Sequence, residues 1–75
     1  MRVGELERLV GREVLIEVSG CWVSCCGRGP ERREGRQEFR GELSGVGEGT
    51  VRLVCWGLGS AMVVIAGAGE VLSVG

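Results

Sequence analysis

Four cysteines are the residues of this chain with the most distinctive chemistry. Three lie close together, at Cys21, Cys25 and Cys26, and Cys55 is distant in the sequence. Four thiolates can hold a structural zinc ion, but such sites favour two Cys-x-x-Cys pairs, whereas this spacing is Cys-x-x-x-Cys-Cys plus a single cysteine. A disulfide is a second alternative. We favour reduced, partly buried thiols, with no metal and no cofactor.

Arginine provides all nine positive charges, and four of them fall between residues 28 and 36. Such a cluster could contact the phosphates of RNA. Glutamates alternate with these arginines and nearly cancel their charge, so we favour a solvated loop of mixed charge. Trp22 and Trp56 could stack on bases, although packing or interface roles are favoured for them. The candidate nucleic-acid-binding residues are Arg32, Arg33, Arg40, Arg52 and Trp22.

Catalytic groups are scarce, because the chain has no His, Lys, Asp or Tyr. Without His, the serines and cysteines lack the usual base that activates a nucleophile. The G-L-G run at residues 57–59 and the G-A-G run at 67–69 lack the Lys-Ser/Thr ending and the helix of a phosphate loop, so turns are favoured. We predict that the protein is not an enzyme and has no small-molecule substrate.

Seventy-five residues with a net charge of −1 predict one domain, residues 1–75, with no general affinity for nucleic acid or membrane. A chain of this size buries only about 60% of the surface of its unfolded form, so a partner subunit would help to stabilise it. The N-terminus has no apolar segment of a signal peptide, and the longest apolar run, residues 61–66, is too short to cross a bilayer. We expect a cytoplasmic protein.

The elements that must position these residues are mostly strands. Helical spacing of apolar residues predicts a short helix at 3–10. Alternating or β-branched runs predict strands at 12–18, 37–45, 50–56, 60–66 and 70–74, separated by glycine-containing turns. The sequence thus predicts a mainly β fold, with a short N-terminal helix followed by a five-stranded, strongly bent antiparallel sheet or small barrel.

The central hairpin, residues 37–54, has the clearest pattern. Phe39, Gly41, Leu43 and Gly45 alternate with polar residues, and the alternation resumes after a glycine-rich turn. The segment before it, at about 19–36, is an inserted or extended hairpin. The only Pro and a dense mix of charges indicate a mobile loop at its tip, residues 27–35.

The order of elements resembles the Sm-like family. The run F-R-G-E-L-S-G-V at residues 39–46 resembles the family's aromatic-x-Gly-x-Leu-x-Gly-hydrophobic core, in which the glycine matching Gly41 permits a sharp bend. The run G-T-V-R-L at 49–53 resembles the third strand of the Hfq branch, and I-A-G at 65–67 stands where the second Sm motif has Ile-Arg-Gly. SH3-like barrels share similar glycine spacing.

The resemblance implies a homo-oligomer, such as a ring, in which the fourth and fifth strands of neighbouring subunits pair along open edges. The interface residues would be Met62, Val64, Ala66, Leu72 and Val74. The family's RNA-contacting positions are changed here: Gly47 stands where members often carry Asp, Val51 stands near the family's Asn, and the Lys-His pair of the Hfq branch is absent.

Three functions remain open at this stage. The first is a non-enzymatic, Sm-like oligomeric module that binds RNA through arginine contacts to the backbone. The second is a structural or protein-interaction scaffold of the same small-barrel shape that does not bind nucleic acid. The third, a zinc-stabilised adaptor, depends wholly on the four cysteines.

Overall fold

The structure is a computed structural model and describes residues 3–25, 27–57 and 59–75. A short helix, α1 (Val3–Leu6), continues as a 3-10 turn, η1 (Glu7–Leu9), and five strands follow. These are β1 (Glu13–Cys25), β2 (Arg28–Gly47), β3 (Thr50–Gly57), β4 (Ser60–Gly67) and β5 (Val71–Val74), with a second 3-10 turn, η2 (Ala68–Glu70), before β5. The mainly β fold with a short N-terminal helix is therefore confirmed.

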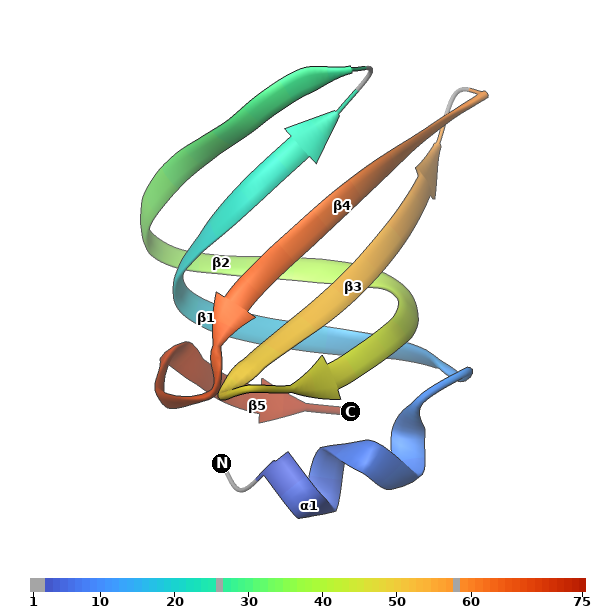
Figure 1. Cartoon of the computed structure of the whole chain (residues 1–75), viewed down its shortest axis with the longest axis vertical. Coiled ribbons are helices and arrows are strands. Elements are labelled where there is room, and N and C mark those ends of the chain that lie inside the picture. Colours follow the sequence, from blue (N-terminus) through green and yellow to red (C-terminus); the bar gives the residue numbers. More distant parts are fainter. Residues whose placement is uncertain (1–2, 26, 58) are drawn as a thin grey trace.

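The sheet is antiparallel throughout and is organised around β1. One edge of β1 pairs with β2 from Glu13 to Cys25. Its other edge pairs first with β5, around Ile16–Val18, and then with β4, from Trp22 to Cys25. Strands β2, β3 and β4 follow one another as hairpins, so the ladder returns to β1 and closes on itself (Figure 1).

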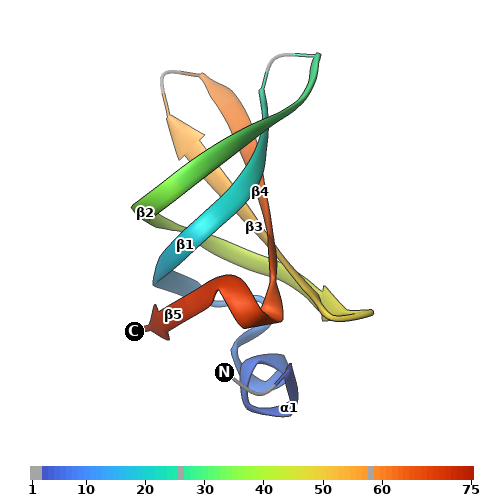
Figure 2. The ribbon, with the colours of Figure 1, turned by 90° about the vertical axis from the view of Figure 1, so that its left-hand side faces the viewer.

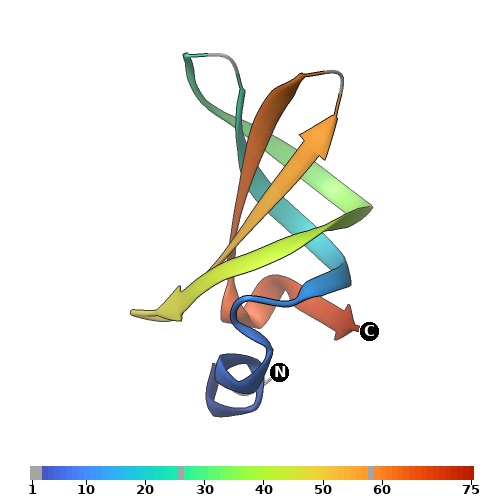
Figure 3. The ribbon, with the colours of Figure 1, turned by 90° about the vertical axis from the view of Figure 1, so that its right-hand side faces the viewer.

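The two ends of the molecule differ. The tips of the β1–β2 and β3–β4 hairpins lie together at one end, and α1, β5 and both termini lie at the other (Figures 1 and 2). Figure 3 shows α1 beneath the sheet at this second end. Leu6 of α1 is 1% exposed and belongs to the core. The helix therefore covers the end of the molecule opposite the hairpin tips.

Among the described residues no polar or charged side chain is buried, and the core is built mainly by alternate residues of the strands. The buried side chains form a single cluster. Fully burying one Val, Leu or Ile side chain contributes roughly 1.5–3 kcal/mol to the stability of a fold. The cluster contains Leu6, Val14, Ile16, Val18, Cys21, Val23, Phe39, Leu43, Val51, Leu53, Val64, Ala66 and Val71.

The alternation predicted for the central hairpin is confirmed for Phe39, Gly41 and Leu43, which are buried. It was wrong for Gly45, because the β2–β3 ladder shifts register after Leu43 and pairs Gly45 with the exposed Arg52. Gly41 lies where β2 begins to pair with β3, and a Cβ atom there would meet the carbonyl oxygen of Val54 and lie 3.0 Å from the Cα of Cys55. Only glycine lets the two backbones approach so closely. A side chain at this position would therefore push β2 and β3 apart.

The predicted loop at residues 27–35 was wrong, because β2 begins at Arg28 and pairs with β1 almost to the tip. Pro30 is accommodated because this half of β2 has β1 on one edge only, within the described part of the chain. Gly35, with φ +96°, lies where the ladder shifts register between Val18 and Gly20, as a β-bulge requires. Pro and Gly here mark an edge strand and a bulge.

Three smaller differences concern element ends. The first strand was predicted to end at 18 and runs to Cys25, and the helix expected at 3–10 divides into α1 and η1. The expected tight turn at 67–69 is the 3-10 turn η2, in which the backbone N–H of Gly67 donates to Glu70 Oε1 (3.4 Å). The longer first strand has the larger consequence, because its second half lies beside β4.

Candidate functional site

Strand β4 is apolar on both faces, and the described residues leave its outer face partly exposed. Val64 and Ala66 point inward and are 2% exposed, so Ala61, Val63 and Ile65 point outward. Paired residues of antiparallel strands share a face. Ile65 pairs with Trp22, Val63 with Val54 and Ala61 with Trp56. We define the apolar outer face as Trp22, Val54, Trp56, Ala61, Val63 and Ile65.

The two tryptophans are the most prominent side chains of this face. Trp56 is 75% exposed and Trp22 is 44% exposed, while the aliphatic residues between them are half-buried. Their partners on β4 are four residues apart, which is about 13 Å along a strand. Large exposed aromatics around a β-branched centre are typical of a protein-interaction surface.

Charges of both signs surround the apolar outer face. Arg52 pairs with Ile65 on one side, and Glu42 pairs with Val54. Arg40 lies beside Trp56 in a hollow that is also lined by Glu13 and Glu42. The rim is therefore mixed in charge, which matters for the choice of partner.

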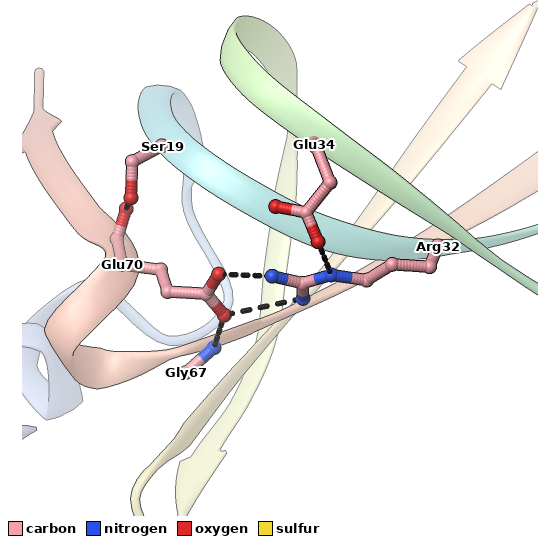
Figure 4. Close-up of polar contacts among 5 residues, drawn as sticks. All are labelled: Ser19, Arg32, Glu34, Gly67 and Glu70. Atoms are coloured by element: carbon pink, nitrogen blue, oxygen red, sulfur yellow. Dashed lines mark hydrogen bonds and ion pairs between the residues drawn. The ribbon is translucent and has the colours of Figure 1, made fainter.

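A second polar feature joins the β1–β2 hairpin to the turn before β5 (Figure 4). Arg32 Nη2 donates to Glu70 Oε2 at 2.5 Å, Nη1 donates to Oε1 at 3.3 Å, and Nε donates to Glu34 Oε1 at 2.8 Å. Gly20 lies beneath this pair, and a Cβ there would lie 2.6 Å from Glu70 Oε2. Two-pronged Arg–carboxylate contacts are among the stronger polar interactions in proteins.

The Arg32–Glu70 pair also positions one end of the apolar outer face. The Arg32 guanidinium lies over the ring of Trp22, 5.6 Å from its centroid. The hydrogen bond from Arg32 lowers the pKa of Glu70, and the hydrogen bonds to Glu70 and Glu34 raise the pKa of Arg32. Both side chains keep about 30% of their surface exposed, so water screens their attraction in part. Arg32 therefore contacts both Glu70 and Trp22.

The lowered pKa of Glu70 gives a pH-dependent prediction. Its ordinary value is 4.5 and its folded value is lower, so the ionised carboxylate stabilises the fold fully above about pH 4.5. We expect the chain to melt at a higher temperature than Glu70→Gln at pH 7, and the difference to disappear as the pH falls through the folded pKa. Thermal melts across pH 2–7 measure this. Equal melting temperatures at pH 7 would contradict it. Glu48→Gln, in the exposed β2–β3 turn, is the control.

The cysteines do not form a cluster in the part of the chain that the structure describes. No group of three metal-ligating side chains gathers among residues 3–25, 27–57 and 59–75. Cys26, one member of the alternative zinc set, lies outside the described residues. Cys21 and Cys55 are free thiols that face inward, and burial raises the pKa of both. Thiols with raised pKa values are poor nucleophiles at neutral pH.

The predicted RNA-binding residues do not share one surface. Arg32 is committed to Glu34 and Glu70, and Trp22 lies against it. Arg33 lies on the other face of β2 from Arg32 and pairs with the buried Cys21 of β1. Arg52 and Arg40 are exposed at the rim of the apolar outer face. The structure therefore brings Arg40 and Arg52 to the tryptophans and separates Arg33 from them.

The five residues of the predicted oligomer interface differ in their burial. Val64 and Ala66 are core residues, Met62 and Val74 pack against the core, and Leu72 is 46% exposed. The expectation that β4 presents an open edge was wrong for residues 62–65, because the second half of β1 pairs with them. β5 pairs with β1 on one edge only, within the described part of the chain.

Sequence reasoning missed Glu70 as the partner of Arg32, and it missed Trp56 as the most exposed aromatic residue. Thirty-eight positions separate Arg32 from Glu70, and no local pattern joins them. The position of Trp56 on β3 does carry a signal, since it follows the outward residues Arg52 and Val54 at a period of two.

Comparison with protein-family models, curated proteins and solved structures finds no match for this chain. In the described residues, no helix has the length and apolar character needed to cross a membrane.

Proposed function

We propose that this protein is a non-enzymatic interaction module that associates with a second copy of itself through the apolar outer face. The observation that supports this proposal best is the position of Trp22 and Trp56 around Val54, Val63 and Ile65 on one uncovered face of the sheet. A chain of 75 residues has a small core, and burying these side chains between two copies would add to its stability.

The mixed rim favours a second copy over other partners. A two-fold interface places the same patch on both subunits, so the patch must complement itself. Here the apolar centre can meet an apolar centre, and the positive Arg52 and Arg40 can meet Glu42 of the other copy. A nucleic acid would instead favour a rim with a large excess of positive charge.

Pairing along the open edge of β2 is disfavoured by the sequence of that edge. Residues 28–38 include Pro30, the bulge at Gly35 and an alternation of Arg and Glu. Proline, bulges and charges are the means by which edge strands avoid pairing with other chains. A face-to-face association therefore fits this chain better than edge addition at β2.

The Sm-like resemblance offers a different assembly, a ring made by the β4 and β5 edges. Residues 62–65 of β4 already pair with β1, so such a ring would use the edge of β5 with the remainder of β4, or would displace β1. We place the face-to-face pair first, since it needs no rearrangement. The two assemblies differ in mass and in the role of Leu72 on β5.

The mass in solution tests the proposed function directly. We expect light scattering coupled to gel filtration to give twice the 7.9 kDa chain mass at micromolar concentration, and the chain mass on dilution. A multiple of five to seven would support the ring instead. A monomer at every accessible concentration would exclude self-association and leave binding to a different protein.

RNA binding is the second candidate, and the shared hollow of Arg40 and Trp56 favours it. An arginine beside an exposed aromatic ring can contact a phosphate while the ring stacks on a base. We expect weak binding to single-stranded RNA at low salt that falls steeply as salt rises. Fluorescence anisotropy with Arg40→Gln measures it, and Arg8→Gln, on η1, is the matched control. Equal binding by both variants at low salt would exclude this site.

A further inference from the structure

A hollow of about 420 Å³ is lined by the last part of β1, the first part of β2 and the first part of β4. Figure 1 shows these parts of the strands toward the end of the molecule opposite α1. Mouths of small barrels are frequent ligand sites, and pockets for small molecules begin at about 300 Å³. Two hairpins that are distant in the sequence build this hollow. Its lining residues are Val23, Cys25, Arg28, Gly29, Glu31, Arg33 and Met62.

The floor of the hollow is apolar. Val23 is 5% exposed, and Met62 is half-buried against the core. Met62 pairs with Cys25 of β1 on one side and with Cys55 of β3 on the other, so its side chain lies between the two hairpins. An unbranched thioether side chain adapts readily to an apolar guest.

The rim of the hollow is charged, with two arginines and one glutamate. No ion pair involves Arg28 or Arg33 within the ranges that the structure describes, whereas Arg32 and Arg36 of the same strand pair with carboxylates. Glu31 also lines the hollow without an ion pair among those ranges. The rim therefore has two uncommitted guanidinium groups and a net positive charge.

The position of Arg33 on the concave side has independent support. Burial raises the pKa of the Cys21 thiol, and the charge of Arg33 is the strongest effect that opposes this rise. Cys21 is fully buried and directly opposite Arg33 in the ladder. Arg33 therefore lies on the side of β2 that faces the interior of the sheet, above the apolar floor.

We infer that this hollow binds a small amphipathic anion, with its apolar chain on Val23 and Met62 and its carboxylate on Arg28 and Arg33. A guanidinium group matches a carboxylate with two parallel hydrogen bonds. An apolar chain gains about 0.8 kcal/mol for each CH₂ group that leaves water. The floor and the rim thus recognise the two halves of one ligand.

This site is separate from the apolar outer face. Residues that line the floor alternate along β1 and β4 with Trp22, Ser24, Ala61 and Val63, which point to the other side of the sheet. Loss of self-association therefore leaves the hollow unchanged, and failure of one proposal does not decide the other.

Octanoate is the probe, because it combines a carboxylate with a flexible apolar chain. We expect saturable binding to the ¹⁵N-labelled chain, with amide shifts concentrated at Val23, Arg28, Gly29, residues 31–33 and Met62. Arg33→Gln should weaken binding about tenfold, the effect of losing one charged contact of about 1.4 kcal/mol. Arg8→Gln makes the same charge change on η1 and should bind like the parent chain.

Two further ligands test the two halves of the site. Octan-1-ol should bind more weakly than octanoate, and acetate, which has almost no apolar chain, should not saturate. Binding of octylammonium as tight as that of octanoate would overturn the inference, because it would assign the site to Glu31. Octanoate shifts centred on the apolar outer face, equal binding by Arg33→Gln, or no saturable octanoate binding would overturn it as well.

Discussion

Replacing Gly41 by alanine is expected to destabilise the fold by about 3 kcal/mol or more, the upper end of the range for overpacking. The new methyl group would overlap the carbonyl oxygen of Val54, with the Val54 carbonyl carbon 2.9 Å away. These are backbone atoms of a paired strand, so they cannot move without opening the β2–β3 ladder. A small domain has only a few kcal/mol to lose. The melting temperature should therefore fall by roughly 10–20 °C.

Gly45→Ala is the matched control for this prediction. Gly45 lies on the same strand, and it is one of the four alternating residues of the sequence pattern. A Cβ at Gly45 meets nothing within 4 Å, and its φ is not in the left-handed region. Its substitution should change the stability by no more than about 0.5 kcal/mol. Thermal and urea unfolding of both variants decide the matter, and equal losses would show that the strands do not cross closely at Gly41.

Gly41 also illustrates which features of the fold the sequence predicts. Its place in the alternation of Phe39 and Leu43 predicts a buried strand position, because the period of two is a local property of the chain. The same alternation predicts that Val51 and Leu53 face the core, which the structure confirms. The positions of the helix and of the strands along the chain follow from similar local patterns.

Contacts between residues that are far apart in the chain could not be predicted from local sequence patterns. Residues 28–36 form part of a strand, although Gly and Pro usually indicate a loop. The strand accommodates Gly35 at a bulge and Pro30 at an edge position. The pairing of Arg32 with Glu70 depends on that strand, because only a paired β2 carries Arg32 to the turn before β5. The local mixture of Arg and Glu thus predicts a solvated loop, whereas in the fold the same residues form an edge strand.

The pairing of β1 with β4 explains why the candidate site was predicted only in part. The sequence named Trp22, Arg40 and Arg52, and it described β4 as apolar on both faces. It could not show that the outer face of β4 lies between the two tryptophans, since this depends on the β1–β4 pairing. The extension of β1 to Cys25 creates the apolar outer face and also closes the β4 edge.

Trp56→Ser is expected to abolish self-association at micromolar concentration. Tryptophans that become buried at an interface often contribute 2 kcal/mol or more, so the dissociation constant should rise about thirtyfold or more. Trp56 is 75% exposed in the single chain, and its loss should leave the fold intact. Light scattering measures the mass, and circular dichroism melts at low concentration check the fold. An unchanged mass would remove Trp56 from the interface.

Leu72→Ser separates the face-to-face pair from the strand-edge ring. Leu72 is 46% exposed on β5, which pairs with β1 alone in the described part of the chain and offers the edge that a ring would use. Its substitution removes exposed apolar surface, as Trp56→Ser does, and should leave the dimer mass unchanged. If Leu72→Ser dissociates the assembly and Trp56→Ser does not, the β5 edge is the interface. Because Trp56 lies on β3 and Leu72 on β5, which do not pair with each other in the described part of the chain, this pair of variants assigns the interface to one of the two strands.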